Sequence, residues 1–199
     1  MGHHAVTLSK NIGGISITDG KQVAKIDLST GAFIVTDYSH HEIHNGESFE
    51  FTMAVTLGSG ASQDVIVQTP NTAEYAHMLG VIDATTTAQF RLYEGCTKTS
   101  LTLSSGWNRN RNNAATASTV IWIGADPGSG DDGTLIRDYS SGTSSNQSKS
   151  SSGVRDVHER ILKRNTKYLY RAISGAAGNL INFDLNWYQH TNEDGIVLH

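Results

Sequence analysis

Apolar and polar residues alternate along much of the chain after Gly46, which is the period of a β-strand that buries one face. The stretch "SFEFTMAVTL" at residues 48–57 shows the alternation most clearly. One of its faces carries Phe49, Phe51, Met53, Val55 and Leu57, and the other carries Glu50, Thr52, Ala54 and Thr56. The pattern predicts a half-buried strand over these residues.

Further strands are predicted downstream of this one. "SQDVIVQTP" and "EYAHMLGVIDA" read as two strands separated by a turn at Pro70 and Asn71. "TAQFRLYEG" repeats the alternation, and its inward positions are Ala88, Phe90 and Leu92. The apolar run from Val120 to Ile123 is short enough to be a buried strand of a sandwich.

The last third of the chain predicts an exposed turn followed by two strands. "ERILKRNTKYLYRAIS" is basic at first, and it then alternates Tyr168, Tyr170 and Ala172 with Leu169, Arg171 and Ile173. "GNLINFDLNWYQ" predicts a closing strand whose apolar positions are Leu180, Ile181, Phe183, Leu185 and Trp187.

The N-terminal stretch has a less regular pattern, because its alternating pieces are brief and are broken at "TDG" and "STG". The pieces contain Ile15 and Ile17, then Val23, Ile26 and Leu28, then Phe33 and Val35. Such short strands cannot form an independent core. We therefore predict an N-terminal arm with short strands over residues 1–46, a β-sandwich domain over residues 47–192 and a C-terminal tail over residues 193–199.

Two polar stretches interrupt the predicted strands. "SSGWNRNRNNAATAS" reads as a polar loop, and "DPGSGDDGTLIRDYSSGTSSNQSKSSSGVR" reads as a long Gly/Ser-rich loop that neighbouring subunits would hold in place. With seven or eight strands and no convincing helix, the expected class is all-β. The expected architecture is an antiparallel β-sandwich of jelly-roll type with an extended N-terminal arm.

Composition and charge narrow the range of partners. The 199 residues carry a formal net charge of −4 and only 17% are charged, so no broad field favours nucleic acid or an anionic membrane surface. The single cysteine, Cys96, excludes an internal disulfide framework and reads as a small apolar strand residue. No apolar run is long enough to span a bilayer, and the first residues lack a signal-peptide apolar region. We expect a protein that is made and assembled in the cytosol.

The stretch "DYSHHEIHNG" raises the question of a metal site. The helical metalloprotease motif fails, because Asn45 stands where the second histidine would be needed. On a strand, His40, Glu42 and His44 would share one face and could supply ligands to a divalent ion, although no fourth ligand is evident. We favour hydrogen bonds that fix the arm, with pH-sensitive assembly as a hypothesis. A metal-dependent enzyme that uses these three residues is the less favoured possibility.

Other candidate chemistry is limited. The sequence contains no nucleophile elbow and no phosphate loop, so no catalytic residue is predicted. Asp126, Asp131 and Asp132 invite a calcium-loop interpretation but lack the ligand order, and we favour an exposed acidic turn. In "WNRNRNN", Trp107, Arg109 and Arg111 could stack on bases or sugars, and we favour an intersubunit contact.

Several stretches between Thr30 and Asn192 resemble structural proteins encoded among the head genes of tailed bacteriophages. They are "TGAFIVTDYSHHEIHNGESF", "GASQDVIVQTPNTAEYAHMLG", "FRLYEGCT", "NRNR", "GTLIRD", "HERILKRNTKYLYRAIS" and "NFDLNWYQHTN". The resemblance implies a trimeric β-sandwich subunit on the outer surface of the phage head, where it acts as a capsid decoration or cement protein.

This resemblance also implies the partners. They are the major capsid protein and further copies of the chain in a homotrimer, without nucleic acid, membrane, cofactor or catalytic residue. The contact residues expected on the arm are Ile15, Ile17, Val23, Ile26, Phe33, His40, His41 and His44. The alternative is a virion or tail binding module that recognises host-surface carbohydrate around Trp107 and Arg109.

Overall fold

The computed structural model describes residues 7–9, 14–17, 22–25, 38–99, 101–125, 130–141 and 159–191. The chain divides into two compact units, Met1–His41 and Glu42–His199. The division falls inside helix α1 (Tyr38–Asn45), whereas the predicted boundary followed Gly46. Each unit is described by itself.

The described part of the first unit is a small antiparallel sheet. Its strands are β1 (Thr7–Ser9), β2 (Gly14–Ile17) and β3 (Gln22–Lys25), in the order β1-β2-β3. Ile15 and Ile17 lie on β2 and Val23 lies on β3, as the short alternating pieces predict. The predicted contact residues Ile26 and Phe33 lie outside the described residues.

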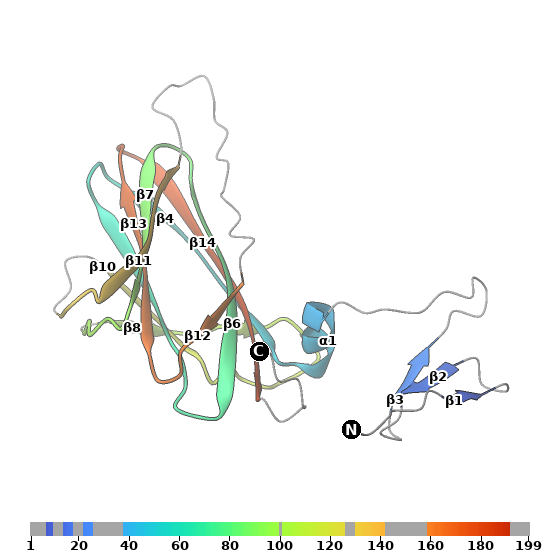
Figure 1. Ribbon diagram of the computed structural model, residues 1–199. Helices are drawn as coiled ribbons and strands as arrows, with labels where there is room; N and C mark the ends of the chain where they lie inside the picture. Colours follow the sequence, from blue (N-terminus) through green and yellow to red (C-terminus); the bar gives the residue numbers. More distant parts are fainter. Residues whose placement is uncertain are drawn as a thin grey trace. The chain divides into compact units, whose positions relative to one another are not determined.

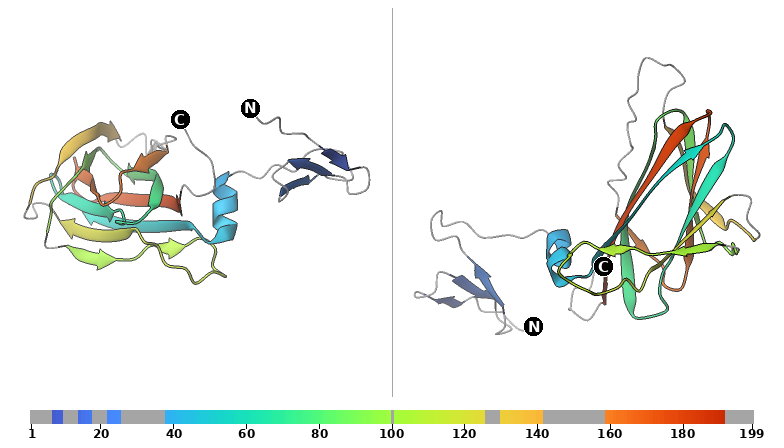
Figure 2. Two further views of the ribbon diagram at one scale, coloured as in Figure 1. Left: turned by 60° about the horizontal axis from the view of Figure 1, so that its bottom comes forward. Right: turned by 180° about the vertical axis from the view of Figure 1, so that it is seen from behind.

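The second unit consists of two antiparallel sheets (Figures 1 and 2). One has six described strands in the order β11-β7-β13-β5-β10-β8, and the other has five in the order β12-β6-β14-β4-β9. The strands of the six-stranded sheet are β5 (Ser62–Gln68), β7 (Ala88–Glu94), β8 (Thr102–Ser104), β10 (Val120–Ala125), β11 (Thr134–Ser141) and β13 (Lys167–Ser174). Those of the five-stranded sheet are β4 (Ser48–Leu57), β6 (Glu74–Ala84), β9 (Trp107–Asn108), β12 (Arg160–Leu162) and β14 (Asn179–Thr191).

The two sheets enclose one hydrophobic core, which makes this unit a β-sandwich. Its largest fully buried side chains include Trp187, Phe49, Phe183, Phe90 and Tyr168, which come from both sheets. The alternation in β4 and β14 places the predicted apolar positions inward, and the two strands pair along ten residues. Burial of such a continuous apolar set is the main source of stability for a fold of this kind.

Most of the strands predicted from alternation are confirmed. β4, β5, β6, β7, β10, β13 and β14 all lie where the sequence predicts them. Ala88, Phe90 and Leu92 are buried, as predicted for the inward face of β7. Leu180 is the exception in the closing strand, because it faces outward and is 37% exposed.

Three predictions about irregular segments are wrong. The sequence predicts no helix, but residues Tyr38–Asn45 form α1. The predicted long Gly/Ser-rich loop contains β11, which pairs with β7. β11 contains a register shift between Leu135 and Arg137, which interrupts the alternation that would reveal it. The predicted polar loop, residues 104–118, contains β9 and begins at the last residue of β8, and both strands are too short to carry a periodic signal.

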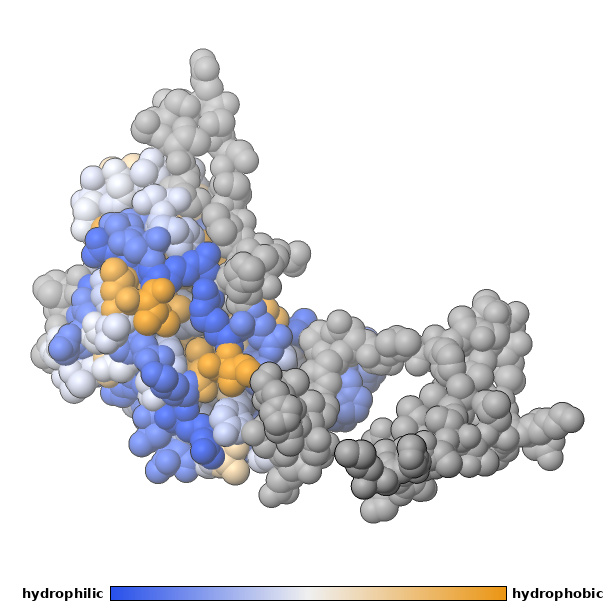
Figure 3. Space-filling view, viewed as in Figure 1, coloured by the Kyte–Doolittle hydropathy of each residue, from blue (hydrophilic) through white to orange (hydrophobic). Residues whose placement is uncertain are grey.

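The exposed surface is mainly polar. On the face shown in Figure 3, hydrophobic residues form separate areas within a mostly hydrophilic surface. The large apolar side chains that are exposed in the described part are Leu103, Trp107, Leu135, Ile136, Ile161 and Leu180. The described residues include no helix with the length and apolar character that crossing a bilayer requires.

Candidate functional site

The histidine-rich stretch forms helix α1 and not the strand on which a shared metal face depends. Asn45 and Gly46 end the helix, and Gly46 has a φ of +81°. The Gly46 N–H donates to the carbonyl of Ile43 at 3.1 Å, and the Glu47 N–H donates to that of Glu42 at 3.0 Å. These two bonds form a Schellman motif, for which a glycine in this conformation is the usual residue. "HNG" is therefore a helix stop signal.

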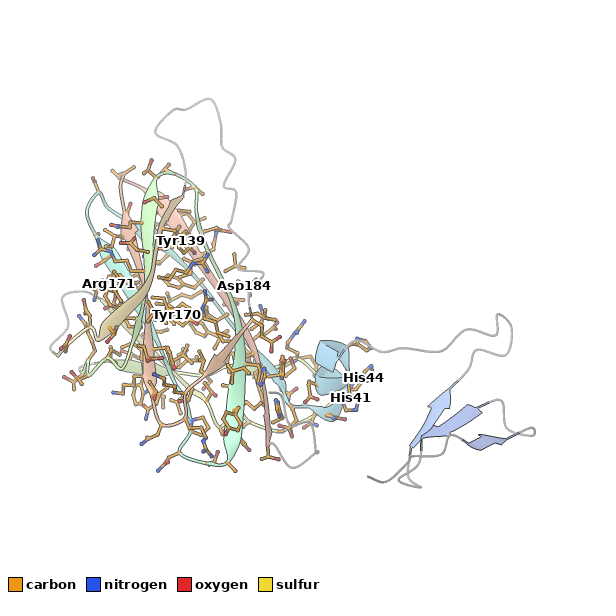
Figure 4. All side chains as sticks on the ribbon, in the orientation of Figure 1. His41, His44, Tyr139, Tyr170, Arg171 and Asp184 are labelled. Atoms are coloured by element: carbon orange, nitrogen blue, oxygen red, sulfur yellow. The ribbon has the colours of Figure 1, made fainter. Side chains whose placement is uncertain are left out.

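The helical conformation separates the proposed metal ligands. His40 and His44 are four positions apart and share a face, whereas Glu42 lies between them on the opposite side. His40, His41 and His44 are exposed and Glu42 is buried, so the three proposed ligands do not converge. Figure 4 labels His41 and His44 on this helix. No group of three or more His, Cys, Asp and Glu side chains in the described part is arranged to hold a metal ion.

The loop "WNRNRNN" clasps the end of this helix through asparagine side chains. Asn110 Nδ2 donates to the carbonyl of His44 at 3.1 Å and Asn113 Nδ2 donates to that of Asn45 at 3.3 Å. Asn108 Nδ2 donates to the carbonyl of Gly46 at 2.7 Å. The last carbonyls of a helix have no partner within the helix, and here three successive residues receive one from the same loop.

Each of these asparagines also fixes the shape of its own loop. Oδ1 of Asn108 accepts from the N–H of Asn110 at 2.9 Å, and Oδ1 of Asn113 accepts from that of Ala115 at 2.8 Å. Oδ1 of Asn110 accepts from the N–H of Asn112 at 3.2 Å. Such Asx turns explain why asparagine recurs at these positions, since the short amide bonds its own backbone and a neighbouring carbonyl together.

The clasp brings two predicted groups of site residues together, although they lie about sixty positions apart in the sequence. We use "helix–loop surface" for residues Glu42–Gly46 and Trp107–Asn113. Trp107 is 60% exposed, and the guanidinium carbon of Arg111 lies 5.3 Å from the centre of its ring. Arg109 is also exposed. An exposed tryptophan beside two arginines suits a protein or a saccharide partner, and both interpretations of this loop stay predictions.

We expect that Asn108→Ala lowers the free energy of unfolding by about 1–3 kcal/mol, because it leaves the Gly46 carbonyl without its donor. Asn108 is only 7% exposed, so water cannot readily replace its amide. Urea unfolding followed by tryptophan fluorescence measures the change. Asn112→Ala, in an exposed position of the same loop, is the control and should cost less than about 0.5 kcal/mol. Equal losses in the two variants would contradict the clasp.

A buried cluster of charges that the sequence analysis missed lies on the outer face of the six-stranded sheet, around Arg171, which Figure 4 labels. Arg171 donates from Nε and Nη2 to the two carboxylate oxygens of Asp64, at 2.7 and 2.9 Å. The same guanidinium donates from Nη1 and Nη2 to Asp132, at 2.7 and 2.9 Å. Lys98 Nζ lies 3.0 Å from Asp132 Oδ1 and 3.8 Å from Asp64 Oδ2.

The charge cluster is largely buried, and it contains two acidic and two basic side chains. Asp64, Lys98 and Arg171 are at most 5% exposed. The hydrogen bond from Arg171 to Asp64 is the largest influence on the guanidinium and raises its pKa. Burial alone would raise the pKa of Asp132, but hydrogen bonds from Arg171 and Lys98 hold this pKa below its ordinary value. The Asp132 carboxylate is therefore charged, and the carboxylates of Asp64 and Asp132 both accept hydrogen bonds from Arg171, which suits a structural role.

The charge cluster and a small apolar cluster hold the loop that follows β7, which contains Cys96 and Lys98, against the sheet. Ile66, Tyr93, Leu169 and Cys96 are buried together on this outer face. Cys96 follows β7 and is not itself in a strand, and burial raises the pKa of its thiol. Asp132 is the one member of the predicted acidic turn that joins the charge cluster. Oδ1 of Asp131 accepts from the Gly133 N–H at 3.0 Å, and Asp126 lies outside the described residues.

A second polar cluster, in which His77 and Tyr188 are buried and Glu159 is exposed, lies on the outer face of the five-stranded sheet. His77 Nδ1 contacts Glu159 Oε1, and the Tyr188 hydroxyl donates to the same oxygen. His77 Nε2 lies 2.8 Å from His190 Nε2, so these two facing nitrogens share one proton at most. Burial lowers the pKa of His77, which outweighs the opposing hydrogen bond from Glu159.

The lowered pKa of His77 predicts a loss of stability in acid. An unfolded histidine has a pKa of about 6.5, so below that pH the unfolded chain binds a proton that folded His77 does not take up. The contribution of His77 is thus complete above about pH 6.5 and declines as the pH falls towards the folded pKa. Unfolding free energies from pH 8 to pH 5 should show a shallower slope for His77→Gln than for the wild type. Identical slopes would contradict this assignment.

The helix–loop surface contains the exposed predicted residues His44, Trp107, Arg109 and Arg111, and the charge cluster joins Asp64 of β5 and Arg171 of β13 to Lys98 and Asp132 in the loops beside them. Comparisons of the chain with protein-family models, with curated proteins and with solved structures give no match.

Proposed function

We propose that the protein is a capsid decoration protein that binds the outer surface of a tailed-phage head as a homotrimer and stabilises the shell. In this proposal a jelly-roll sandwich stands on the capsid, and the N-terminal residues form an arm that contacts the major capsid protein. The resemblance of the sequence to phage head proteins supplies the location. The division of the chain into two compact units supports separate roles for the arm and the sandwich.

The strand order supports a jelly roll. Leaving aside β8, β9 and β10, the remaining strands form two sets of four, in the orders β12-β6-β14-β4 and β11-β7-β13-β5. Strands β4, β5, β6 and β7 alternate between the two sheets along the chain, and so do β11, β12, β13 and β14. Two interleaved four-strand sets of this kind are the arrangement of double Greek-key jelly rolls, which occur in viral capsid and lectin domains.

The single observation that carries the proposal is a separate N-terminal unit whose chain enters the sandwich through an anchored helix end. Strands of three or four residues, such as those of β1, β2 and β3, rarely hold together without a further partner surface. The Schellman motif and the asparagine clasp fix the last residues of α1 to the sandwich. The end of α1 is therefore joined to the sandwich by hydrogen bonds as well as by the chain itself.

The edges of the sandwich support an oligomer. β11 and β12 are the first strands of their sheets in the described part, and they carry Leu135, Ile136 and Ile161. These side chains are 45% to 55% exposed. Exposed apolar side chains on an edge strand favour contact with another chain, which a closed trimer would satisfy.

Sedimentation of the intact protein with capsids that lack it tests the proposal. We expect a trimer mass for the free protein, and saturable co-sedimentation with a fixed number of copies for each capsid. Protein that stays in the supernatant at all concentrations, beside a sedimenting positive control, would exclude the decoration role.

A further inference from the structure

The β5–β6 turn and the β12–β13 turn lie at one end of the sandwich (Figure 1), and an open hollow lies between them. Its volume is about 790 Å³, and its lining includes Asn71, Thr72, Tyr75, Lys163, Arg164 and Asn165. The hollow is open to solvent, and Asn71, Thr72, Lys163, Arg164 and Asn165 are all exposed. The hollow shares no residue with the helix–loop surface, the charge cluster or the second polar cluster.

The two turns that form the hollow are tied to each other. Oγ1 of the buried Thr69 donates to the carbonyl of Lys163 at 2.6 Å and accepts from the Thr166 N–H at 2.9 Å. The Thr69 N–H donates to the carbonyl of Thr166 at 3.0 Å, and the Asn165 N–H donates to that of Pro70 at 2.9 Å. Because these bonds fix the backbone of both turns, ordering the backbone on ligand binding costs little entropy.

The lining is cationic and rich in neutral hydrogen-bonding groups. Its charged members are Lys163 and Arg164, and because Lys163 Nζ donates to Glu94 Oε1 at 2.6 Å, Arg164 is the cation available to a ligand. The guanidinium carbon of Arg164 lies 5.0 Å from the centre of the Tyr75 ring, and Nη1 donates to the carbonyl of Thr72 at 3.2 Å. That bond uses one of the five N–H donors of arginine, so the planar group is held in place while it presents further donors.

We propose that this hollow binds a carboxylated saccharide. Arg164 receives the carboxylate as a two-donor fork. The side-chain amides of Asn71 and Asn165 and the hydroxyl of Thr72 meet the sugar hydroxyls, which both donate and accept. The volume exceeds what a lone inorganic anion fills, and the uncharged groups have no role for such an ion. The carboxylate can come from a terminal sialic acid or from a uronic acid of a polysaccharide.

Titration calorimetry of the intact protein tests this site with 3′-sialyllactose, a galacturonic acid trimer and neutral lactose. We expect saturable binding of at least one acidic sugar and binding of lactose at least about tenfold weaker, which corresponds to about 1.4 kcal/mol. The acidic sugar that binds identifies the source of the carboxylate. Arg164→Ala should weaken binding at least about tenfold, and Arg164→Lys should weaken it less, since lysine keeps the charge but not the fork.

Arg137→Ala is the matched control, because Arg137 also lies over an aromatic ring, that of Tyr139, but outside the hollow. It should leave the affinity within about twofold of the wild type. Three results would each overturn the proposal: no saturable binding of either acid at millimolar concentrations, equal binding of lactose, or full affinity in a folded Arg164→Ala variant. An oligonucleotide that binds through Arg164 while both acidic sugars fail would also overturn it. Co-sedimentation of Arg164→Ala with capsids should be unchanged, so failure here is separate from failure of the decoration role.

Discussion

Replacement of Arg171 by methionine is expected to lower the free energy of unfolding by about 3–5 kcal/mol. The substitution removes four hydrogen bonds, two to Asp64 and two to Asp132. Asp64, which is 1% exposed, then keeps only the ion pair with Lys98 at 3.8 Å. Loss of one partner costs far more than the net value of the pair, because the remaining charge stays buried without compensation.

A matched control is available on the neighbouring strand. Arg91 lies opposite Arg171 in the β13–β7 pairing, and its Nε is 3.3 Å from Asp138 Oδ2, an ion pair without hydrogen-bond geometry. The side chains of this pair are 33% and 37% exposed, so Arg91→Met should cost less than about 1 kcal/mol. Urea unfolding of both variants measures the difference. A loss below 1 kcal/mol for Arg171→Met would show that the charge cluster does not stabilise the fold.

Removal of residues 1–41 is expected to leave a folded sandwich that no longer binds capsids. The cut follows the division between the two units and keeps Glu42, which is buried, together with the Schellman motif at Gly46. In the proposed function the capsid contacts lie on the arm. Its removal should therefore weaken co-sedimentation by about 100-fold or more, which corresponds to about 2.8 kcal/mol.

A longer deletion controls for the position of the cut. Removal of residues 1–46 also deletes the carbonyls of His44, Asn45 and Gly46, which accept the asparagine amides. This variant should be less stable than the shorter deletion, as measured by urea unfolding. Capsid binding that survives in the shorter deletion would place the contact on the sandwich and reject the role of the arm.

The framework of the sandwich was predictable because its central strands are long and half buried. β4 and β14 carry an apolar residue at alternate positions over much of their length, and this alternation follows directly from burial of one face. The edge elements carry no such signal. β8, β9 and β12 have two or three residues, and the register shift in β11 moves its side chains out of phase.

The candidate site was predictable only in part. The residues Trp107 and His44 could be singled out by type, but their proximity depends on hydrogen bonds between segments far apart in the sequence. The helix stop at Asn45 and Gly46 was a usable signal, yet the histidines suggested a strand face for metal ligands. Arg171 and Asp64 looked like ordinary outward positions of strands, because alternation does not reveal that a loop covers the outer face of a sheet.

The most direct measurement of the central claim is an electron cryomicroscopy map of the phage head at a resolution that traces the chain. We expect three sandwiches around a threefold axis on the outer surface, with residues 1–41 of each copy in contact with the capsid shell. A head whose map lacks the sandwich, or a sandwich that meets the shell while residues 1–41 make no contact with it, would contradict the account.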